Sequence, residues 1–304
     1  MTAIAAAMGN RFVAVMRTYD TLIGCLNQAI PGGIAACGAG QAGIIATGWV
    51  EPDTGRNRVA VVEPFCGGSG GRVRCDGVDA TDTMIGFLKS TPIEHVETET
   101  PLVVRRHELV PDRFGHGKYR GGASIAIELE CHAVEARITV RGLDRFRFQP
   151  WGVFGGGSGT NCVTTLNPGR EARNIGRIKV LTLAEGDLLR MVSSSGGGFG
   201  PPTERDPSAV LRDVLDGMLD IQAAREIYGV VIRDRAVDGA ATDALRSALA
   251  KPSEGFSVRH GPARQQYEKS WPVERSVALA NRVLAAPPGL RRKVMADGKR
   301  EVTI

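Results

Sequence analysis

Apolar positions near the start of the chain recur at helical spacing and then give way to glycine-rich segments. Within residues 10–30 the apolar side chains fall three or four positions apart, which is the period of an α-helix with one buried face. The run Pro31-Gly32-Gly33 ends the pattern. We therefore expect a helix over 10–30 whose apolar stripe needs a partner surface. The stripe consists of Phe12, Val15, Met16, Tyr19, Leu22, Ile23 and Leu26.

The middle of the chain follows the two-residue period of half-buried β-strands. After an expected strand at 58–63, apolar and polar side chains alternate over 125–130 and again over 134–140. The connection Cys131-His132-Ala133 between the latter two is short enough for a hairpin. A second hairpin is expected from 178–183 and 188–192, on either side of Glu185-Gly186-Asp187.

Helical signals return in the last third of the chain. Asp206-Pro207 is typical of a helix start, because Asp supplies a capping oxygen and Pro fits the first turn. Further helices are expected at 221–227 and from Pro272 to the stop at Pro287-Pro288-Gly289. The helix after Pro272 is expected to carry Val273, Val277, Ala280 and Leu284 on one face.

These elements predict an α+β fold with a mainly antiparallel central region, either a sandwich or barrel-like, flanked by helices and followed by an irregular basic tail. We divide the chain into an N-terminal α/β segment with a glycine-rich loop (1–100), an antiparallel β domain (101–200), and a helical segment with a basic tail (201–304).

Composition narrows the functional classes. The chain of 304 residues is 42% hydrophobic and holds 39 glycines, which favours many tight turns. It has no run of about 18 apolar residues, so we expect no membrane span. Its start lacks the pattern of a secretory signal, and none of its six cysteines forms a CxxC pair. We therefore expect a cytoplasmic protein with reduced, mostly buried thiols.

The net charge of +5 belongs to the end of the chain. Residues 251–304 hold eleven Lys and Arg against five Asp and Glu, so the remainder is close to neutral. A basic tail suits nucleic acid or an acidic partner surface. Because no stacking aromatics alternate with these basic residues, we favour docking on another subunit over nucleic acid.

The sequence motifs give little support for a nucleotide site or a metal site. The glycine loop 67–71 is followed by neither a Lys-Ser/Thr pair nor an apolar helix, so no phosphate motif is completed. The loop 155–159 lacks one as well. No two of the five histidines have helical ligand spacing, and His107, Asp112 and His116 straddle an expected turn. We expect no metal site built wholly from this chain.

Two motifs carry a family resemblance. They are Lys118-Tyr119-Arg120-Gly121-Gly122, and Gly196-Gly197-Gly198-Phe199-Gly200-Pro201 leading into Glu204-Arg205-Asp206-Pro207. With the order of segments around them, over roughly residues 18–232, they resemble the hydantoinase B/oxoprolinase family, which is related to acetone and acetophenone carboxylase subunits. The resemblance is to the C-terminal portion of the B-type subunit. The family's metal-binding run, Asn-Asp-Pro followed by Gly-Gly and His, is absent here.

The resemblance implies a subunit of an ATP-dependent amidohydrolase that opens cyclic amides such as hydantoins or 5-oxoproline. The implied partners are a hydantoinase A-type ATP-binding subunit and a separate N-terminal-half B-type subunit. ATP with Mg²⁺ and a divalent metal would be bound by these partners and not by this chain. A subunit of a ketone carboxylase and a non-catalytic assembly scaffold stay open as alternatives.

Candidate site residues follow from the same segments. Glu94 and Glu97 supply carboxylates for general base work, or else form a surface pair balanced by Arg105 and Arg106. Arg120 suits bidentate recognition of an anionic group, or else binds backbone carbonyls or Glu128. Glycines that would let backbone amides approach a substrate, or else serve tight turns and packing, are Gly67, Gly68, Gly121, Gly122, Gly197 and Gly198.

Overall fold

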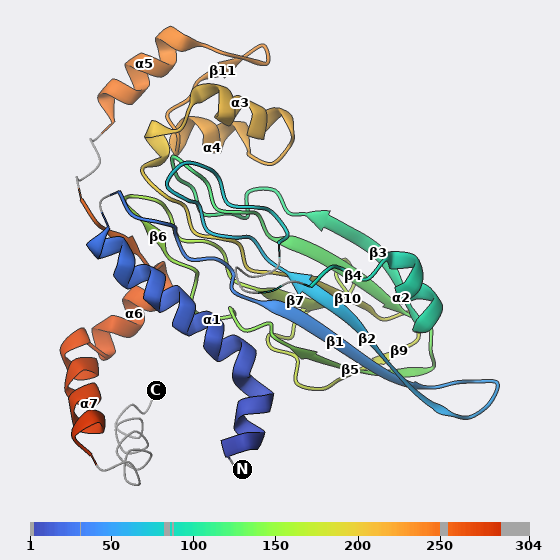
Figure 1. Cartoon of the computed structure of the whole chain (residues 1–304). Coiled ribbons are helices and arrows are strands. Elements are labelled where there is room, and N and C mark those ends of the chain that lie inside the picture. The colour runs from blue at the N-terminus through green and yellow to red at the C-terminus, as the bar shows by residue number, and fades with distance from the viewer. Residues whose placement is uncertain (1–2, 31, 82–85, 87, 250–254, 287–304) are drawn as a thin grey trace. The chain divides into compact units, whose positions relative to one another are not determined.

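The fold is described from a computed structural model of the chain. This structure describes residues 3–30, 32–81, 86, 88–249 and 255–286. The chain divides into two compact units, Met1–Gly261 and Pro262–Ile304, and the order of elements is shown in Figure 1.

Two antiparallel sheets form the centre of the first unit. The first sheet has the strand order β2 (Asn57–Cys66), β1 (Ala42–Val50), β5 (Glu135–Arg141), β9 (Leu181–Ala184). The second sheet has the order β3 (Leu102–Leu109), β4 (Ile125–Cys131), β10 (Leu188–Val192), β7 (Val163–Leu166), β8 (Arg173–Asn174). Because β1 and β2 pair in one sheet with β5 and β9, strands from before and after residue 100 share that sheet. The three-segment division stays an interpretation of the sequence.

One hydrophobic core joins the two sheets. Ile45 and Ile138 from the first sheet and Leu129, Leu189 and Met191 from the second are all buried in the same cluster. Burial of this kind, at roughly 25 cal/mol per Å² of apolar surface, is the main favourable term in folding. The sheets do not close on themselves, so the expectation of a sandwich is confirmed and that of a barrel is wrong.

The alternation of side chains is confirmed in β5 and fails in β4. Every second residue of β5 is buried, while β4 is buried along nearly its whole length. Glu128 in β4 is 8% exposed. This carboxylate is compatible with burial because Arg190 and Arg106 pair with it.

Both expected hairpins are wrong. β4 pairs with β3 and β10, while β5 pairs with β1 and β9. β9 and β10 likewise lie in different sheets. The physical reason is that the apolar faces of both strands are satisfied across the sandwich. Four residues of extended chain span about 13 Å, enough to cross the roughly 10 Å between packed sheets.

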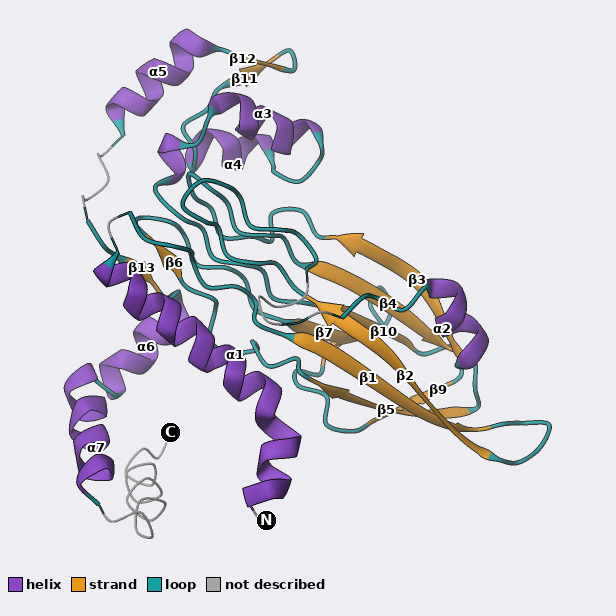
Figure 2. Ribbon diagram, in the orientation of Figure 1, coloured by secondary structure: helices purple, strands orange, loops and turns teal. Residues whose placement is uncertain are grey.

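A block of glycine-rich loops continues from one end of the strands. We call the segments 35–41, 66–78, 115–123, 150–160 and 193–200 the glycine bundle. Figure 2 shows them as loops running side by side between the strands and the helices α3 (Pro207–Leu215) and α4 (Ile221–Glu226). Their backbones bond to one another across the segments, so buried N–H and C=O groups find partners. Examples are Gly197 N to Cys37 O (2.8 Å), Gly71 N to Gly197 O (2.9 Å), Gly122 N to Ser69 O (2.8 Å) and Gly196 N to Gly122 O (2.9 Å).

The bundle requires glycine at several positions because the neighbouring backbones leave no space for a side chain. A Cβ built on Gly68 would lie 1.8 Å from the carbonyl oxygen of Gly122, and one on Gly196 would lie 1.8 Å from that of Ser69. Neither glycine adopts a positive φ. These glycines therefore serve close approach of backbones, not a left-handed turn.

Helices cover one end of the glycine bundle. The expected start at Asp206-Pro207 is confirmed, since the Asp206 carboxylate accepts from Ser208 N at 2.9 Å and caps α3. α4 confirms the helix expected at 221–227. Buried side chains of these helices pack on Phe114 and on the bundle residue Ala123. Other elements of this unit are α1 (Ala3–Ala29), α2 (Ile93–Glu99), the 3-10 turn η1 (Pro202–Glu204), α5 (Gly239–Ala248), and the short strand pairs β11 (Ile232–Arg233) with β12 (Ala236–Val237) and β6 (Gly152–Val153) with β13 (Val258–Arg259).

The second unit contains α6 (Pro262–Ser270) and α7 (Val273–Ala285). α7 confirms the helix expected after Pro272, and Trp271 Nε1 donates to Ser276 Oγ at 2.7 Å across its first turn. Val277 and Leu284 on its expected apolar face are exposed. The end of the basic tail, 287–304, lies outside the described residues.

None of the described helices combines the length and the apolar character needed to cross a bilayer.

Replacing Gly68 by Ala tests the spatial role of glycine in the bundle. Because the added methyl would meet a backbone carbonyl that is itself held by neighbours, we expect the free energy of unfolding to fall by at least about 2 kcal/mol. Gly239→Ala is the matched control, since nothing lies within 4 Å of its Cβ position. There we expect no loss and a gain of up to about 1 kcal/mol. Urea denaturation measures the free energy of unfolding of both variants. Equal values would contradict the claim that the bundle has no space for a side chain at Gly68.

Candidate functional site

The two predicted acids lie on α2, beside β3. Glu94 occupies the first turn of this helix, and Glu97 Oε1 accepts a hydrogen bond from Val104 N at 2.9 Å. Both side chains are exposed. The expected pairing with Arg105 and Arg106 is wrong: these cations pair with Glu130 and Glu128, acids that come from the adjacent strand β4.

Arg120 lies apart from those acids, within a network of buried arginines and buried or half-buried carboxylates. Its guanidinium donates to Asp79 at 2.8 and 3.2 Å and to Asp213 at 3.2 Å. It also donates to the Gly121 carbonyl at 3.2 Å, so the expected carbonyl contact is confirmed. The expected contact with Glu128 is wrong, because Arg190 and Arg106 occupy that carboxylate.

A second arginine completes this network. Arg205 donates to both oxygens of Asp76, at 2.6 and 2.7 Å, and to Asp213 at 2.9 Å. The Arg120 backbone N–H also donates to Asp76, at 2.9 Å. We call Asp76, Asp79, Arg120, Arg205 and Asp213 the charge network. It ties α3 to two segments of the glycine bundle.

The pKa shifts in the charge network agree with mutual pairing. Burial acts to raise the pKa of Asp79, but hydrogen bonds from Arg120 and from the Ala123 N–H hold it below the ordinary value. Burial acts to lower the pKa of Arg120, yet the neighbouring carboxylates raise it. Arg120 is 9% exposed and Arg205 is 3% exposed. Both cations are paired with carboxylates of the protein itself and therefore stabilise the fold. The catalytic role of Arg120 stays a prediction.

The six predicted glycines all lie in the glycine bundle. The structure brings Gly68 against Gly122 and Gly121 against Gly196 and Gly197. Gly67 faces Ala39 and the Ser194 carbonyl, and Gly198 faces the His116 carbonyl. Gly68 is the one of the six that also lines the pocket described next. Their role in substrate binding stays a prediction.

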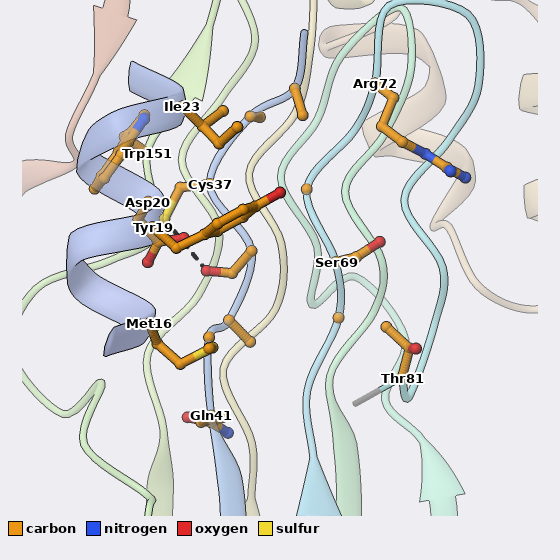
Figure 3. A pocket seen from close by; sticks show the side chains of 17 residues that line it. Met16, Tyr19, Asp20, Ile23, Cys37, Gln41, Ser69, Arg72, Thr81 and Trp151 are labelled. Atoms are coloured by element: carbon orange, nitrogen blue, oxygen red, sulfur yellow. Dashed lines mark hydrogen bonds between the residues drawn. The ribbon is translucent and has the colours of Figure 1, made fainter. Parts of the chain in front are cut away.

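A pocket lies between α1 and the glycine bundle (Figure 3). Its cavity of about 40 Å³ is the space open to the centres of water-sized spheres. That is room for a few waters or a small ring, since one water needs about 10–15 Å³ on this measure. Figure 3 shows Met16, Tyr19 and Ile23 on the helix side and Ser69 and Thr81 across from them. The remaining lining comes from Asp20, the segment Ala35–Gln41, Gly68, Gly70, Arg72 and Trp151.

Asp20 is the buried acid of this pocket. Its carboxylate accepts from Arg145 Nη2 at 3.0 Å and lies 3.3 Å from Arg17 Nη2. Burial raises the pKa of Asp20 to about 6, although the Arg17 charge opposes the shift. The Arg145 contact also favours the ionised form. A carboxyl group that titrates close to neutral pH in a pocket is a candidate proton donor or acceptor.

Two further polar groups border the same cavity. Cys37 is buried, and burial raises the pKa of its thiol well above the ordinary value, so it is no thiolate nucleophile. Gln41 is 1% exposed, and its Oε1 accepts from Cys162 Sγ at 3.1 Å. Its Nε2 meets no acceptor among the described residues. An unpaired buried amide N–H is costly, so this group marks a place where a ligand acceptor would be stabilised.

The described residues offer no group of three or more His, Cys, Asp or Glu side chains arranged to hold a metal ion. His116 instead shares a 3.0 Å hydrogen bond with the Tyr228 hydroxyl, and burial lowers its pKa. None of the six cysteines forms a disulfide; Cys25 and Cys75 are exposed and the others are buried. The pocket therefore has polar groups suited to binding and proton transfer, without a metal ligand set of its own.

Sequence reasoning missed Asp20, Gln41 and Arg145. A signal for Asp20 was present, because it lies four residues after Met16 and seven before Asn27 on one helix face, and all three are buried. An acid and an amide within a buried stripe indicate polar partners on the body of the protein. For Gln41 and Arg145 we find no comparable signal.

Replacing Arg205 by Met tests the charge network. The substitution removes the cation that pairs with Asp76 and one of the two that pair with Asp213, so we expect a loss of about 2 kcal/mol or more in the free energy of unfolding. Lys118→Met is the matched control, because its pair with Glu204 is exposed at 3.2 Å and should cost at most about 1 kcal/mol. Chemical denaturation at neutral pH compares them; an Arg205→Met loss no larger than that of the control would show the network to be dispensable.

The Asp20 pKa predicts how stability changes with pH. The folded value of about 6 exceeds the ordinary 3.8, so between these values the folded protein holds a proton that the unfolded chain has lost. This contribution, at most about 3 kcal/mol, is complete below about pH 4 and is lost as the pH rises through 6. Asp20→Asn lacks the titration. We expect the stability of the wild type relative to this variant to fall between pH 4 and 7. A rise over that range would mean that the arginines dominate and the carboxyl stays ionised.

The region of this chain that matches known proteins covers most of the first unit. The sequence model of the family described as hydantoinase B/oxoprolinase matches residues 2–202. The B subunit of the "Putative D-/L-hydantoinase" of Pseudomonas sp. (strain NS671) is 32% identical over 251 residues, which are 78% of this chain and 40% of that protein. The beta subunit of the caprolactamase of Pseudomonas jessenii is 31% identical over 73% of this chain and 40% of its own length.

Solved structures agree with the sequence relatives. The crystal structure of the ATP-dependent caprolactamase from Pseudomonas jessenii matches with a TM-score of 0.63 and 28% identity, over 73% of this chain and 40% of that one. Acetone carboxylase in its nucleotide-free structure matches with a TM-score of 0.58 at 20% identity, over 81% of this chain and 37% of that one, which shows the fold alone. This chain thus matches about 40% of the length of the hydantoinase and caprolactamase subunits. The chain belongs to the hydantoinase B/oxoprolinase family.

Proposed function

We propose that this chain is a subunit of an ATP-dependent amidohydrolase that opens cyclic amides. It would contribute a wall of the hydrolytic site, together with a partner that corresponds to the metal-bearing N-terminal half of a B-type subunit. A hydantoinase A-type subunit would bind ATP. The observation that carries the proposal is the similarity to the B-type protein of a hydantoinase and to the beta subunit of an ATP-dependent caprolactamase.

The chemistry of the reaction explains the need for several parts. Amide resonance makes unactivated hydrolysis slow, and phosphorylation of the amide oxygen by ATP creates a better leaving group. A divalent metal, when bound by the partner, would supply an activated water. Because the described residues of this chain hold no metal ligand group, we derive no step through a metal here.

The groups that this chain brings to such a site are those of the pocket. Gln41 Nε2 is a free donor for a carbonyl oxygen, and Asp20 is a carboxyl that gains or loses a proton near pH 6. Tyr19 and Trp151 give the cavity flat apolar walls. Such a lining suits a small uncharged ring better than an extended polar chain. The free thiols agree with a cytoplasmic location, which we include in the proposal.

Two alternatives have an observation in their favour. A subunit of a ketone carboxylase is supported by the acetophenone carboxylase delta subunit of Aromatoleum aromaticum, which is 29% identical over 68% of this chain. A non-catalytic assembly scaffold is supported by the charge network, whose cations are all occupied by carboxylates.

Turnover by the assembled complex decides among the three. The chain is purified with its partners from its own cells and supplied with ATP and hydantoin, 5-oxoproline or caprolactam. We expect ring opening that needs ATP and this chain, and at least a tenfold loss in kcat/KM for Gln41→Leu. The matched control Cys162→Ser keeps a donor to Gln41 and should stay within about threefold.

Other outcomes contradict the proposal. ATP turnover that needs a ketone and bicarbonate would establish the carboxylase, and hydrolysis at the same rate without this chain would establish the scaffold. Ring opening by this chain alone would also overturn the shared site.

A further inference from the structure

α1 has its charges on the inside and an uncharged surface outside. From residue 13 onward the only charged side chains of α1 are Arg17 and Asp20. Arg17 donates to the backbone oxygens of Gly40 (2.6 Å) and Ala39 (3.3 Å), and Asp20 pairs with Arg145. A helix that faces water normally has the opposite arrangement, with charged side chains on its exposed face.

The opposite side of α1 is exposed and uncharged. We call it the outer face; it consists of Ala14, Val15, Thr18, Thr21, Leu22, Cys25, Gln28 and Ala29, all exposed. Val15 is 42% exposed and Leu22 is 55% exposed. At 1.5 Å per residue the face is about 22 Å long. Thr18, Thr21, Leu22 and Cys25 line a shallow groove along it, which Arg17 borders while its guanidinium is buried and donates to the Gly40 carbonyl.

The polar side chains on the outer face are satisfied within the helix. Thr18 Oγ1 donates to Ala14 O at 2.9 Å, Thr21 Oγ1 donates to Arg17 O at 2.7 Å, and Gln28 Nε2 donates to Gly24 O at 3.3 Å. Hydroxyls that bond back to the helix leave their methyl groups on the surface. The outer face therefore presents mainly carbon, without charges to keep it in water.

The spacing on this face fits a second helix. Ala14, Thr18, Thr21, Cys25 and Gln28 follow one another at intervals of four, three, four and three residues, the seam of a pair of packed helices. Small residues on the seam let a partner approach closely.

We propose that the outer face of α1 docks an uncharged helix from the part of a B-type protein that lies outside the region matched by this chain. Relatives of this chain are about two and a half times its matched length, so a large body of protein accompanies this fold in the family. We expect this additional part of the protein to pack on the outer face of α1. The proposal rests on the proposed function for the identity of the partner, and it adds the surface through which that partner is held.

Matched substitutions to glutamate test the surface. The full chain, tagged at its C-terminus, is purified from its own cells, and mass spectrometry identifies the proteins that accompany it. We expect a protein that matches the remaining part of the hydantoinase B family. Val15→Glu and Leu22→Glu should lower its recovery at least tenfold. Val180→Glu places the same charge on a valine that is 68% exposed and lies elsewhere on the surface, and it should retain the partner. Circular dichroism and melting temperature check that each variant is folded.

Thiol labelling gives a second measurement without substitution. Cys25 is exposed on the outer face and Cys75 is exposed elsewhere, so the two labelled sites are separated by peptide mass spectrometry. A maleimide should label Cys25 at least tenfold more slowly in the complex than in the isolated chain. Equal labelling, full recovery of the partner with Leu22→Glu, assembly of the chain only with a second copy of itself, or purification of the chain alone would each overturn the docking surface. A complex that forms through this face but opens no cyclic amide would overturn the proposed function and leave the surface standing.

Discussion

Close contact between backbones in the glycine bundle is the constraint on which the rest of the structure depends. Segments from five regions of the chain approach so closely that carbonyl oxygens occupy the places where Cβ atoms would stand. Hydrogen bonds between the segments satisfy the peptide groups that this approach buries. This close approach explains why the block carries so many glycines, while its aromatic side chains, among them Phe154 and Phe199, gather in one cluster.

Both polar sites are built on that block. Gly68, Ser69 and Gly70 form one wall of the pocket, and the same segment continues to Asp76, which joins the charge network. Arg120 lies in another bundle segment and anchors it to α3 through Asp213. A rigid backbone floor fixes these groups more firmly than flexible loops would, and preorganisation of this kind is what a binding or catalytic site needs.

The sequence predicted elements with a strong period and missed how they pair. The helices at 10–30 and after Asp206 follow from spacing and capping chemistry that is local. The hairpin at 131–133 was wrong because a short connection suits both a turn within one sheet and a step between two sheets. Only the shared core, joining Leu129 to Ile138 across the sandwich, distinguishes them. Barrel closure likewise depends on pairing between distant strands.

The candidate site was predictable only in part. The glycine runs were recognised, but spacing could not show that Gly68 meets Gly122. Arg120 was identified from its motif, whereas its partners Asp79 and Asp213 come from distant positions in the sequence. Glu94 and Glu97 lie on α2, apart from this constellation. Asp20 could be recognised as a site residue only from the structure. Its burial and its pairing with Arg145 depend on how α1 packs on the glycine bundle.

Native-state hydrogen exchange tests the central claim, that the glycine bundle is rigid and that its backbone is held by hydrogen bonds although it consists mostly of loops. The amides of Gly71, Gly122, Gly196 and Gly197 all donate across segments. We predict that they exchange only through global unfolding, with protection equal to that of the strand β4. Exchange of these amides at the rate of an exposed loop such as that around Gly55 would contradict the account.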